Sequence, residues 1–262
     1  MKPHWAAVIG SPVRHSLSPR IFRLLRRKLK RDLNYAAITI APDRLEEALA
    51  SAREMPWVGW NVTLPHKEKI LPLLDQVDAS ARAIGAVNVV RFLDGRCIGY
   101  NTDAEGFLAP FSLYGFSIKG ARAVVLGGGG AAKAVCAALR SKEVGELRVF
   151  ARRKGNWTSK KLREAVAEAD LVVQATPLGM DGRSSPLADR QAWKEGALAY
   201  DLVYRPIETP FLRQARSAGA MTLGGLGMLT AQALATWRIW FGEEISPQVG
   251  LQIQEQLEKA LQ

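Results

Sequence analysis

The chain has 262 residues, of which 48% are hydrophobic and 23% are charged. This composition is typical of a globular protein with one or two domains and excludes a disordered or fibrous chain. No apolar stretch approaches the roughly 18 uncharged residues that a membrane span needs, and the first residues show no signal-peptide pattern. We therefore expect a cytoplasmic protein that makes no membrane contact.

The formal net charge is +11, which speaks to partners and solubility rather than to the fold. Nucleic acid, an anionic surface and anionic small molecules are all compatible with this charge. Cys97 and Cys136 lie far apart outside any CxxC pair, and the three histidines lack zinc-ligand spacing. We expect neither a disulfide nor a bound metal.

Strand-like and helix-like segments alternate from the start of the chain, which is the pattern of an α/β fold with mostly parallel sheets. The first lobe is predicted to contain strands at 6–10, 35–40 and 57–62, a helix at about 19–33, a second helix after Asp43 and a short helix that carries Lys67. A hairpin with strands at 86–93 and 96–100 follows. Asp94-Gly95 joins these strands, because this dipeptide supplies the positive φ values of a two-residue turn.

A second lobe is predicted to begin with a helix after Asp103. Its strands are expected at 121–126, 146–150, 170–175 and 197–203, and two helices at about 226–241 and 246–261 end the chain and return to the first lobe. The predicted fold class is therefore α/β with two lobes that are joined by helices and separated by a cleft.

A glycine run follows the strand at 121–126 and precedes a helix of small residues. Glycines let the backbone approach a pyrophosphate, whose charge then meets the N–H groups at the start of the helix. A flexible turn is the simpler alternative, but the strand and the helix on either side favour a dinucleotide site. Its predicted residues are Gly127, Gly128, Gly129, Gly130 and Ala131.

The end of the next strand indicates which dinucleotide binds. NAD enzymes usually place an acidic residue there to hold the ribose 2′-hydroxyl. Here the cations Arg152, Arg153 and Lys154 follow the strand, and guanidinium groups match phosphate oxygens. A solvated basic turn is the alternative, but the position after this strand favours the 2′-phosphate of NADP.

Polar side chains gather near the ends of the strands in the first lobe. They are Ser16, Ser18, Asn61, Thr63, Lys67, Asn88 and Asp103. Each has a simpler structural explanation, such as a helix cap or a strand edge. Together, neutral donors and acceptors with one lysine and one aspartate suit a small hydroxylated acid, and the charged pair supplies proton transfer without a metal.

The order of motifs resembles the shikimate dehydrogenase family over nearly the whole chain. The segments that carry the resemblance are Ser16-Leu17-Ser18-Pro19, Asn61-Val62-Thr63-Leu64-Pro65-His66-Lys67, Gly85-Ala86-Val87-Asn88, Gly99-Tyr100-Asn101-Thr102-Asp103, the glycine run, Ala175-Thr176-Pro177-Leu178-Gly179-Met180, Asp201-Leu202-Val203-Tyr204-Arg205-Pro206 and Gly225-Leu226-Gly227-Met228-Leu229-Thr230-Ala231-Gln232. The resemblance implies NADPH-dependent reduction of 3-dehydroshikimate to shikimate in aromatic amino acid biosynthesis, by a monomer or a homodimer.

The resemblance also implies roles for single residues. Lys67 and Asp103 would be catalytic. Ser16, Ser18 and Tyr204 would hold the substrate carboxylate, while Asn61, Thr63, Asn88, Asp103 and Gln232 would bind the ring hydroxyls. Thr176, Leu202 and Gly227 would contact the cofactor beside the glycine run and the basic segment. The family often has Asn-Arg-Thr where this chain has Ala151-Arg152-Arg153. The implied substrate-binding domain is 1–102 plus 238–262, and the Rossmann-like NADP-binding domain is 103–237.

Two other functions compete with this one. A quinate or aminoshikimate dehydrogenase would share the fold and the lysine–aspartate pair. A nucleic-acid-binding protein could use the basic stretch between Arg23 and Arg31. We expect no nucleic-acid partner, because Leu24, Leu25, Leu29 and Leu33 give this segment a buried helical face and its cations then form a solvated face.

Overall fold

The computed structural model describes residues 4–152, 155, 157, 159–187 and 191–261. The chain divides into two compact units. Unit 1 consists of Met1–Gly106 and Thr230–Ile253, and unit 2 consists of Phe107–Leu229 and Gln254–Gln262. Each unit combines one sheet with helices, so the predicted α/β class is confirmed. The assignment of substrate and cofactor to the two predicted domains stays a prediction.

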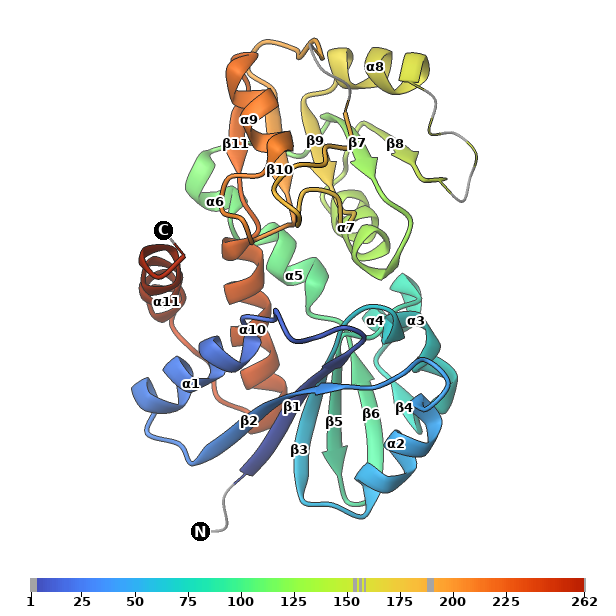
Figure 1. The fold of residues 1–262 in the computed structure, drawn as a ribbon, viewed down its shortest axis with the longest axis vertical. Helices are drawn as coiled ribbons and strands as arrows, with labels where there is room; N and C mark the ends of the chain where they lie inside the picture. The colour runs from blue at the N-terminus through green and yellow to red at the C-terminus, as the bar shows by residue number, and fades with distance from the viewer. Residues whose placement is uncertain (1–3, 153–154, 156, 158, 188–190, 262) are drawn as a thin grey trace. The chain divides into compact units, whose positions relative to one another are not determined.

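The sheet of unit 1 has six strands in the order β2-β1-β3-β5-β6-β4 (Figure 1). Parallel pairing joins β1 to β2 and β3, whereas β5 is antiparallel to both β3 and β6. The turn between β5 and β6 contains Asp94 and Gly95 at φ values of 48° and 72°, as the sequence predicts. The strands are β1 His4–Gly10, β2 Leu33–Thr39, β3 Trp57–Val62, β4 Gln76–Val77, β5 Val89–Leu93 and β6 Arg96–Tyr100.

Helices of unit 1 cover both faces of this sheet (Figure 1). On one face, α2 packs its Leu45 and Leu49 into a core that also holds Trp60 and Ile70. On the other face, aromatic rings of α1 and α10 meet, with Phe22 and Trp240 separated by 5.3 Å between ring centroids. The helices that lie wholly in unit 1 are α1 Ser18–Lys28, α2 Leu45–Arg53, α3 His66–Lys69 and α4 Ala79–Ile84, with a 3-10 turn at Leu71–Leu73. The helices α5 Asp103–Leu108, α10 Leu226–Phe241 and α11 Pro247–Lys259 have residues in both units.

Helix α1 is shorter than the sequence predicts. It ends at Lys28, and Lys30 adopts a left-handed conformation with φ 51° that cannot continue a helix. Leu33 instead opens β2, where it pairs with His4. Of the four leucines of the predicted buried face, Leu25 is buried in the helix, Leu33 is buried in β2 instead, and Leu24 and Leu29 are only half-buried. The residues of α1 that are buried are Ser18, Ile21, Phe22 and Leu25.

Unit 2 contains a five-stranded parallel sheet in the order β11-β10-β9-β7-β8. Its strands are β7 Arg122–Leu126, β8 Glu146–Phe150, β9 Leu171–Gln174, β10 Leu198–Asp201 and β11 Met221–Leu223. Every residue of β9 and β10 is buried, as expected for central strands of a parallel sheet. Its helices are α6 Phe111–Tyr114, α7 Gly130–Ser141, α8 Ser159–Glu168 and α9 Pro210–Ser217.

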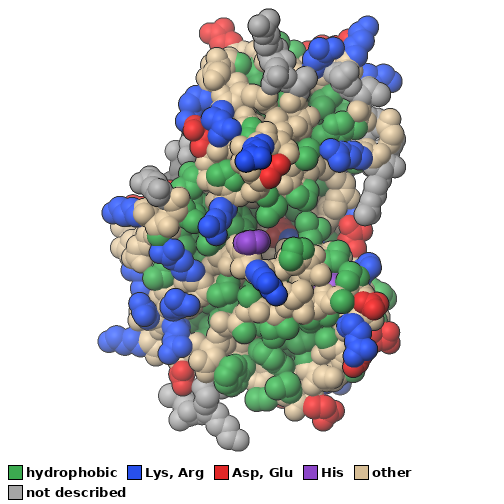
Figure 2. All heavy atoms as spheres, viewed as in Figure 1, with side chains coloured by type: hydrophobic (Ala, Val, Ile, Leu, Met, Phe, Trp, Pro, Cys, Tyr) green, Lys and Arg blue, Asp and Glu red, His purple; other side chains and the backbone are tan. Residues whose placement is uncertain are grey.

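The exposed charges on α1 and the lengths of the helices concern two possible partners, nucleic acid and a membrane. Figure 2 shows Lys and Arg side chains over α1, where Arg20, Arg23 and Arg27 are exposed. Other cations of this segment have partners within unit 1, since Lys28 donates to Gln252 and Arg31 pairs with Glu243. Among the described residues, every helix is too short or too polar to traverse a bilayer.

Gly59 in β3 provides a test of this packing. A Cβ atom built there would lie 1.9 Å from Nε1 of Trp240 and 2.5 Å from the carbonyl oxygen of Val90. The indole Nε1 donates a hydrogen bond to the same carbonyl, so neither atom can move away freely. Gly59→Ala should lower the free energy of unfolding by about 1–3 kcal/mol, because a rigid indole and the sheet backbone must shift.

The measurement is urea unfolding of the Gly59→Ala variant beside Gly224→Ala. At Gly224 the nearest atom to an added Cβ is 3.7 Å away, which is an ordinary contact. Equal unfolding midpoints for the two variants would contradict the close packing of Trp240 on β3.

Candidate active site

The predicted polar residues of unit 1 lie where β3 ends and α3 begins. Asn61 is within β3, and the backbone N–H of Thr63 donates to the carbonyl of Ile9 at 2.9 Å. Close approach here requires Gly10, since a Cβ would lie 2.5 Å from Cγ2 of Thr63. The carbonyl of Lys67 accepts a hydrogen bond from the N–H of Val87 at 2.8 Å, which ties α3 to the chain entering β5.

Lys67 and Asp103 form an ion pair in unit 1. The ammonium Nζ donates to Oδ2 of Asp103 at 2.5 Å, and the two side chains are only 12% and 6% exposed. Charges withdrawn from water to this degree must be paired, because an isolated buried charge costs several kcal/mol. Asp103 is the first residue of α5, where a negative charge interacts favourably with the free N–H groups of the helix.

Asn88 holds the other oxygen of the same carboxylate. Its Nδ2 donates to Oδ1 of Asp103 at 2.9 Å and to Oγ1 of Thr102 at 2.9 Å, and its Oδ1 accepts from the N–H of Thr102 at 2.7 Å. Oδ1 of Asn101 in turn accepts from the N–H of Asp103 at 3.0 Å. The aspartate is thus fixed at its backbone and at both oxygens. Sequence reasoning assigned no role to Asn101 and Thr102, although they directly precede Asp103.

A second polar group surrounds Asn61, which is only 5% exposed. Its Oδ1 accepts a hydrogen bond from the Tyr35 hydroxyl at 2.8 Å, and its Nδ2 donates to Oγ1 of Thr236 at 3.1 Å. The Thr236 hydroxyl donates to the carbonyl of Gln232, one turn earlier on α10, at 2.8 Å. The side chain of Gln232 is also buried. Tyr35 and Thr236 were missed by the sequence analysis, because neither belongs to a recognisable motif.

Ser16 and Ser18 lie at the start of α1. The N–H of Ser18, the first residue of α1, donates to Oγ of Ser16 at 3.2 Å. The Tyr35 hydroxyl, which donates to Asn61, has its pKa raised well above the usual value, because the group is withdrawn from water.

The predicted dinucleotide residues lie between β7 and α7 in unit 2. Gly127 has φ 140°, and a Cβ atom there would lie 2.8 Å from the carbonyl oxygen of Ala175. A Cβ on Gly128 would lie 2.9 Å from Cβ of Ala151. Helix α7 then begins at Gly130 with no side-chain cap, so its first N–H groups are available to an anion. The geometry fits a pyrophosphate.

The remaining predicted cofactor residues, and the predicted substrate residue Tyr204, also belong to unit 2. Arg152 is exposed after β8, with its guanidinium carbon 6.0 Å from the ring centroid of Trp157. Arg153 and Lys154 lie outside the described residues. The Thr176 hydroxyl donates to Oε1 of the fully buried Gln174 at 2.8 Å. Leu202 and Tyr204 are half-buried, and a Cβ on Gly227 would lie 3.0 Å from Cγ of Pro110.

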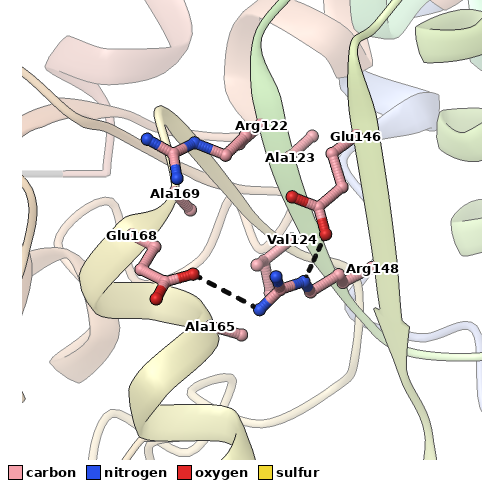
Figure 3. Close-up of a pocket in the computed structure, with 8 residues that line it drawn as sticks. All are labelled: Arg122, Ala123, Val124, Glu146, Arg148, Ala165, Glu168 and Ala169. Atoms are coloured by element: carbon pink, nitrogen blue, oxygen red, sulfur yellow. Dashed lines mark hydrogen bonds and ion pairs between the residues drawn. The ribbon is translucent and has the colours of Figure 1, made fainter.

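A surface pocket beside β7, β8 and α8 contains none of the predicted site residues (Figure 3). Arg148 donates to Glu146 at 2.6 Å and pairs with Glu168 at 3.5 Å within it. The lining holds two cations, Arg122 and Arg148, and two anions, Glu146 and Glu168, and because these charges balance we assign no ligand to this pocket. The described residues hold no cluster of three or more His, Cys, Asp or Glu side chains suited to a metal ion.

The chain is similar to known dehydrogenases over nearly its whole length. A family model described as the shikimate dehydrogenase substrate binding domain matches residues 8–90. Shikimate dehydrogenase (NADP(+)) of Symbiobacterium thermophilum is 40% identical over 258 residues, which cover 90% of this chain and 88% of that protein. The protein of the same name from Streptococcus pneumoniae strain CGSP14 is 36% identical, with 92% of each chain covered.

The fold is similar to a solved structure, that of shikimate 5-dehydrogenase from Thermus thermophilus in complex with NADP(H) and shikimate. It matches with a TM-score of 0.85 and 37% identity, over 97% of this chain and 99% of that chain.

Asp201, beside the predicted cofactor residue Leu202, provides a pH test. It accepts hydrogen bonds from the N–H of Val203 at 2.9 Å and the hydroxyl of Thr209 at 2.5 Å, but burial raises its pKa from 3.8 to about 7. Between these values the unfolded chain has released the proton while the folded chain retains it. The contribution of Asp201 to stability should therefore fall as pH rises from about 4 to 7, by an amount on the order of 4 kcal/mol.

Asp201→Asn removes this titration and preserves the shape of the side chain. The difference in unfolding free energy, variant minus wild type, should increase from pH 4 to pH 7 and stay constant above that. Urea unfolding at several pH values measures it, and a difference independent of pH would contradict the raised pKa.

Proposed function

The chain belongs to the shikimate dehydrogenase family, and we propose that it catalyses the reversible, NADPH-dependent reduction of 3-dehydroshikimate to shikimate, a step of aromatic amino acid biosynthesis. The observation that carries this proposal is the buried pair of Lys67 and Asp103, with Asn88 on the second carboxylate oxygen. Such a pair supplies a proton donor and its orienting partner without a metal.

The proton chemistry follows from the geometry of this pair. When bound, NADPH supplies the hydride that reduces the ketone. Negative charge then develops on the ketone oxygen, and the Lys67 ammonium stabilises this charge and donates a proton to the oxygen. Asp103 fixes the direction of the Lys67 ammonium through their hydrogen bond, while Asn88 prevents rotation of the Asp103 carboxylate.

The neutral polar residues of unit 1 suit a hydroxylated carboxylic acid. We assign the substrate carboxylate to the hydroxyls of Ser16 and Ser18, with Tyr204 as a further donor. Asn61, Thr63, Asn88 and Gln232 would bind the ring hydroxyls together with Asp103. The support is that Ser18, Asn61, Asn88 and Gln232 are buried, polar and gathered in the same unit.

The residues of unit 2 fit NADP. The glycine loop leaves no room for side chains at Gly127 and Gly128, which is what close approach of a pyrophosphate requires. Arg152 would pair with the 2′-phosphate, together with Arg153 and Lys154. Gly129, Gly130 and Ala131 would complete the phosphate loop, and Thr176, Leu202 and Gly227 would contact the rest of the cofactor.

The proposal extends to partners and location. We propose a monomer or homodimer without a nucleic-acid partner, because cations such as Lys28 and Arg31 on the basic segment have partners in unit 1. Among the described residues, the buried Cys97 and Cys136 form no disulfide, which is expected in a reducing compartment, and we propose the cytoplasm.

Four initial rates at 340 nm test the proposed activity, with shikimate and quinate each assayed against NADP and NAD. The highest catalytic efficiency is expected with shikimate and NADP. A preference for quinate would favour the other dehydrogenase activity within the same fold, and absence of turnover with all four pairs would refute both.

Lys67→Ala should lower kcat for shikimate oxidation by roughly 100- to 10,000-fold, the usual contribution of a general acid–base group. KM for shikimate should change much less, because charge develops on the reacting oxygen only as hydride moves. Steady-state rates measure both constants. Lys69→Ala, on the exposed side of the same helix, is the matched control and should behave as wild type.

An unchanged melting temperature and retained NADPH binding establish that the Lys67→Ala protein is folded. Turnover within a few-fold of wild type would show that Lys67 is only a structural partner of Asp103.

Arg152→Ala should raise KM for NADP by roughly 10- to 100-fold, since hydrogen bonds to charged groups contribute about 1.5–3 kcal/mol. KM for NAD should remain nearly unchanged, because NAD lacks the 2′-phosphate. Arg140→Ala removes an exposed cation at the far end of α7 and serves as the control. Equal increases for both cofactors would indicate structural damage instead of lost phosphate recognition.

A further inference from the structure

Tyr35 is a half-buried hydrogen-bonding group that the proposed chemistry does not use. It lies in β2, where it pairs in register with Ala6 of β1, and its ring stacks on Phe22 with 4.3 Å between centroids and an interplanar angle of 7°. The ring of Trp240 lies 6.3 Å away. These aromatic contacts fix the ring, so the phenol oxygen can reach only a narrow region.

The Tyr35 hydroxyl contacts one side chain of the proposed substrate site. It donates to Oδ1 of Asn61 at 2.8 Å. Asn61 is assigned to a ring hydroxyl of the substrate. The tyrosine therefore contacts a side chain that is assigned to the substrate.

The hydrogen bond from Tyr35 helps to set the orientation of the Asn61 carboxamide. A carboxamide can present either its oxygen or its nitrogen to a ligand, and only its hydrogen-bond partners decide between the two orientations. The Tyr35 hydroxyl donates to Oδ1, while the Thr236 oxygen accepts from Nδ2 because its proton is used on the Gln232 carbonyl. Both partners favour the same orientation, and one N–H of Asn61 remains for the ligand.

We propose that Tyr35 is a positioning residue, which holds the Asn61 carboxamide so that its second N–H donates to a ring hydroxyl of the substrate. The proposal rests on the proposed function, since it needs Asn61 to bind the substrate. Without the Tyr35 hydroxyl the carboxamide loses the donor that fixes its oxygen, and a fraction of the molecules then present the wrong group. Substrate affinity falls, whereas the Lys67–Asp103 pair is untouched.

Tyr35→Phe tests the proposal, because it keeps the ring that stacks on Phe22 and removes only the hydroxyl. KM for shikimate should rise by about tenfold, which corresponds to one hydrogen bond, while kcat and KM for NADP should stay within about twofold of wild type. Tyr100→Phe is the matched control. That tyrosine also lies in the sheet of unit 1, and within the described residues its hydroxyl makes no hydrogen bond.

A double-mutant cycle with Asn61→Ala separates positioning from stability. If Tyr35 acts through Asn61, Tyr35→Phe should leave KM for shikimate unchanged once Asn61 is alanine. Full additivity of the two changes, or a wild-type KM in Tyr35→Phe beside a raised KM in Asn61→Ala, would overturn the role of Tyr35 alone. An unchanged KM in Asn61→Ala would overturn the proposed role of Asn61 and that of Tyr35 with it.

Thr236 provides a second route should Tyr35→Phe fail to fold. Thr236→Val removes the acceptor for Nδ2 of Asn61 at nearly constant volume and should raise KM for shikimate, while Thr236→Ser retains the hydroxyl and should restore it. Equal KM values for Val and Ser at this position would contradict the proposed control of Asn61 orientation.

Discussion

The buried ion pair between Lys67 and Asp103 is the constraint on which the proposed activity depends. Neither charge is stable in this environment by itself, so each requires the other and each must be held in place. The structure meets this need with neutral groups, because Asn88 bonds the second carboxylate oxygen and Asn101 the backbone of Asp103. The lysine thereby keeps a defined direction and can act on a reacting oxygen.

The sheet of unit 1 explains how residues distant in sequence reach this pair. Asn61 lies in β3, Lys67 follows in α3, and Asn88 directly precedes β5. The antiparallel pairing of β5 with β6 then returns the chain to Asp103, directly after β6. Hydrogen bonds such as that from the Val87 N–H to the Lys67 carbonyl lock these segments together. The strand order of unit 1 therefore brings Lys67 and Asp103 together.

Sequence reasoning identified the fold class and family correctly, because strong periodicity, turn dipeptides and ordered motifs all agreed. It extended α1 to residue 33, since leucine spacing cannot reveal that Lys30 turns left-handed and that Leu33 pairs with His4. Tyr35 escaped notice for a related reason. A tyrosine on a strand carries no signal of its own, and its role arises only when tertiary packing brings it to Asn61.

The most direct test of the central claim is a crystal structure of the wild-type protein with shikimate and NADP. The ring hydroxyl to be oxidised should lie within about 3 Å of both Nζ of Lys67 and the carboxylate of Asp103. The shikimate carboxylate should lie at Ser16 and Ser18. Shikimate bound with its reacting hydroxyl on another titratable side chain, and out of reach of Lys67, would contradict the catalytic role of the pair.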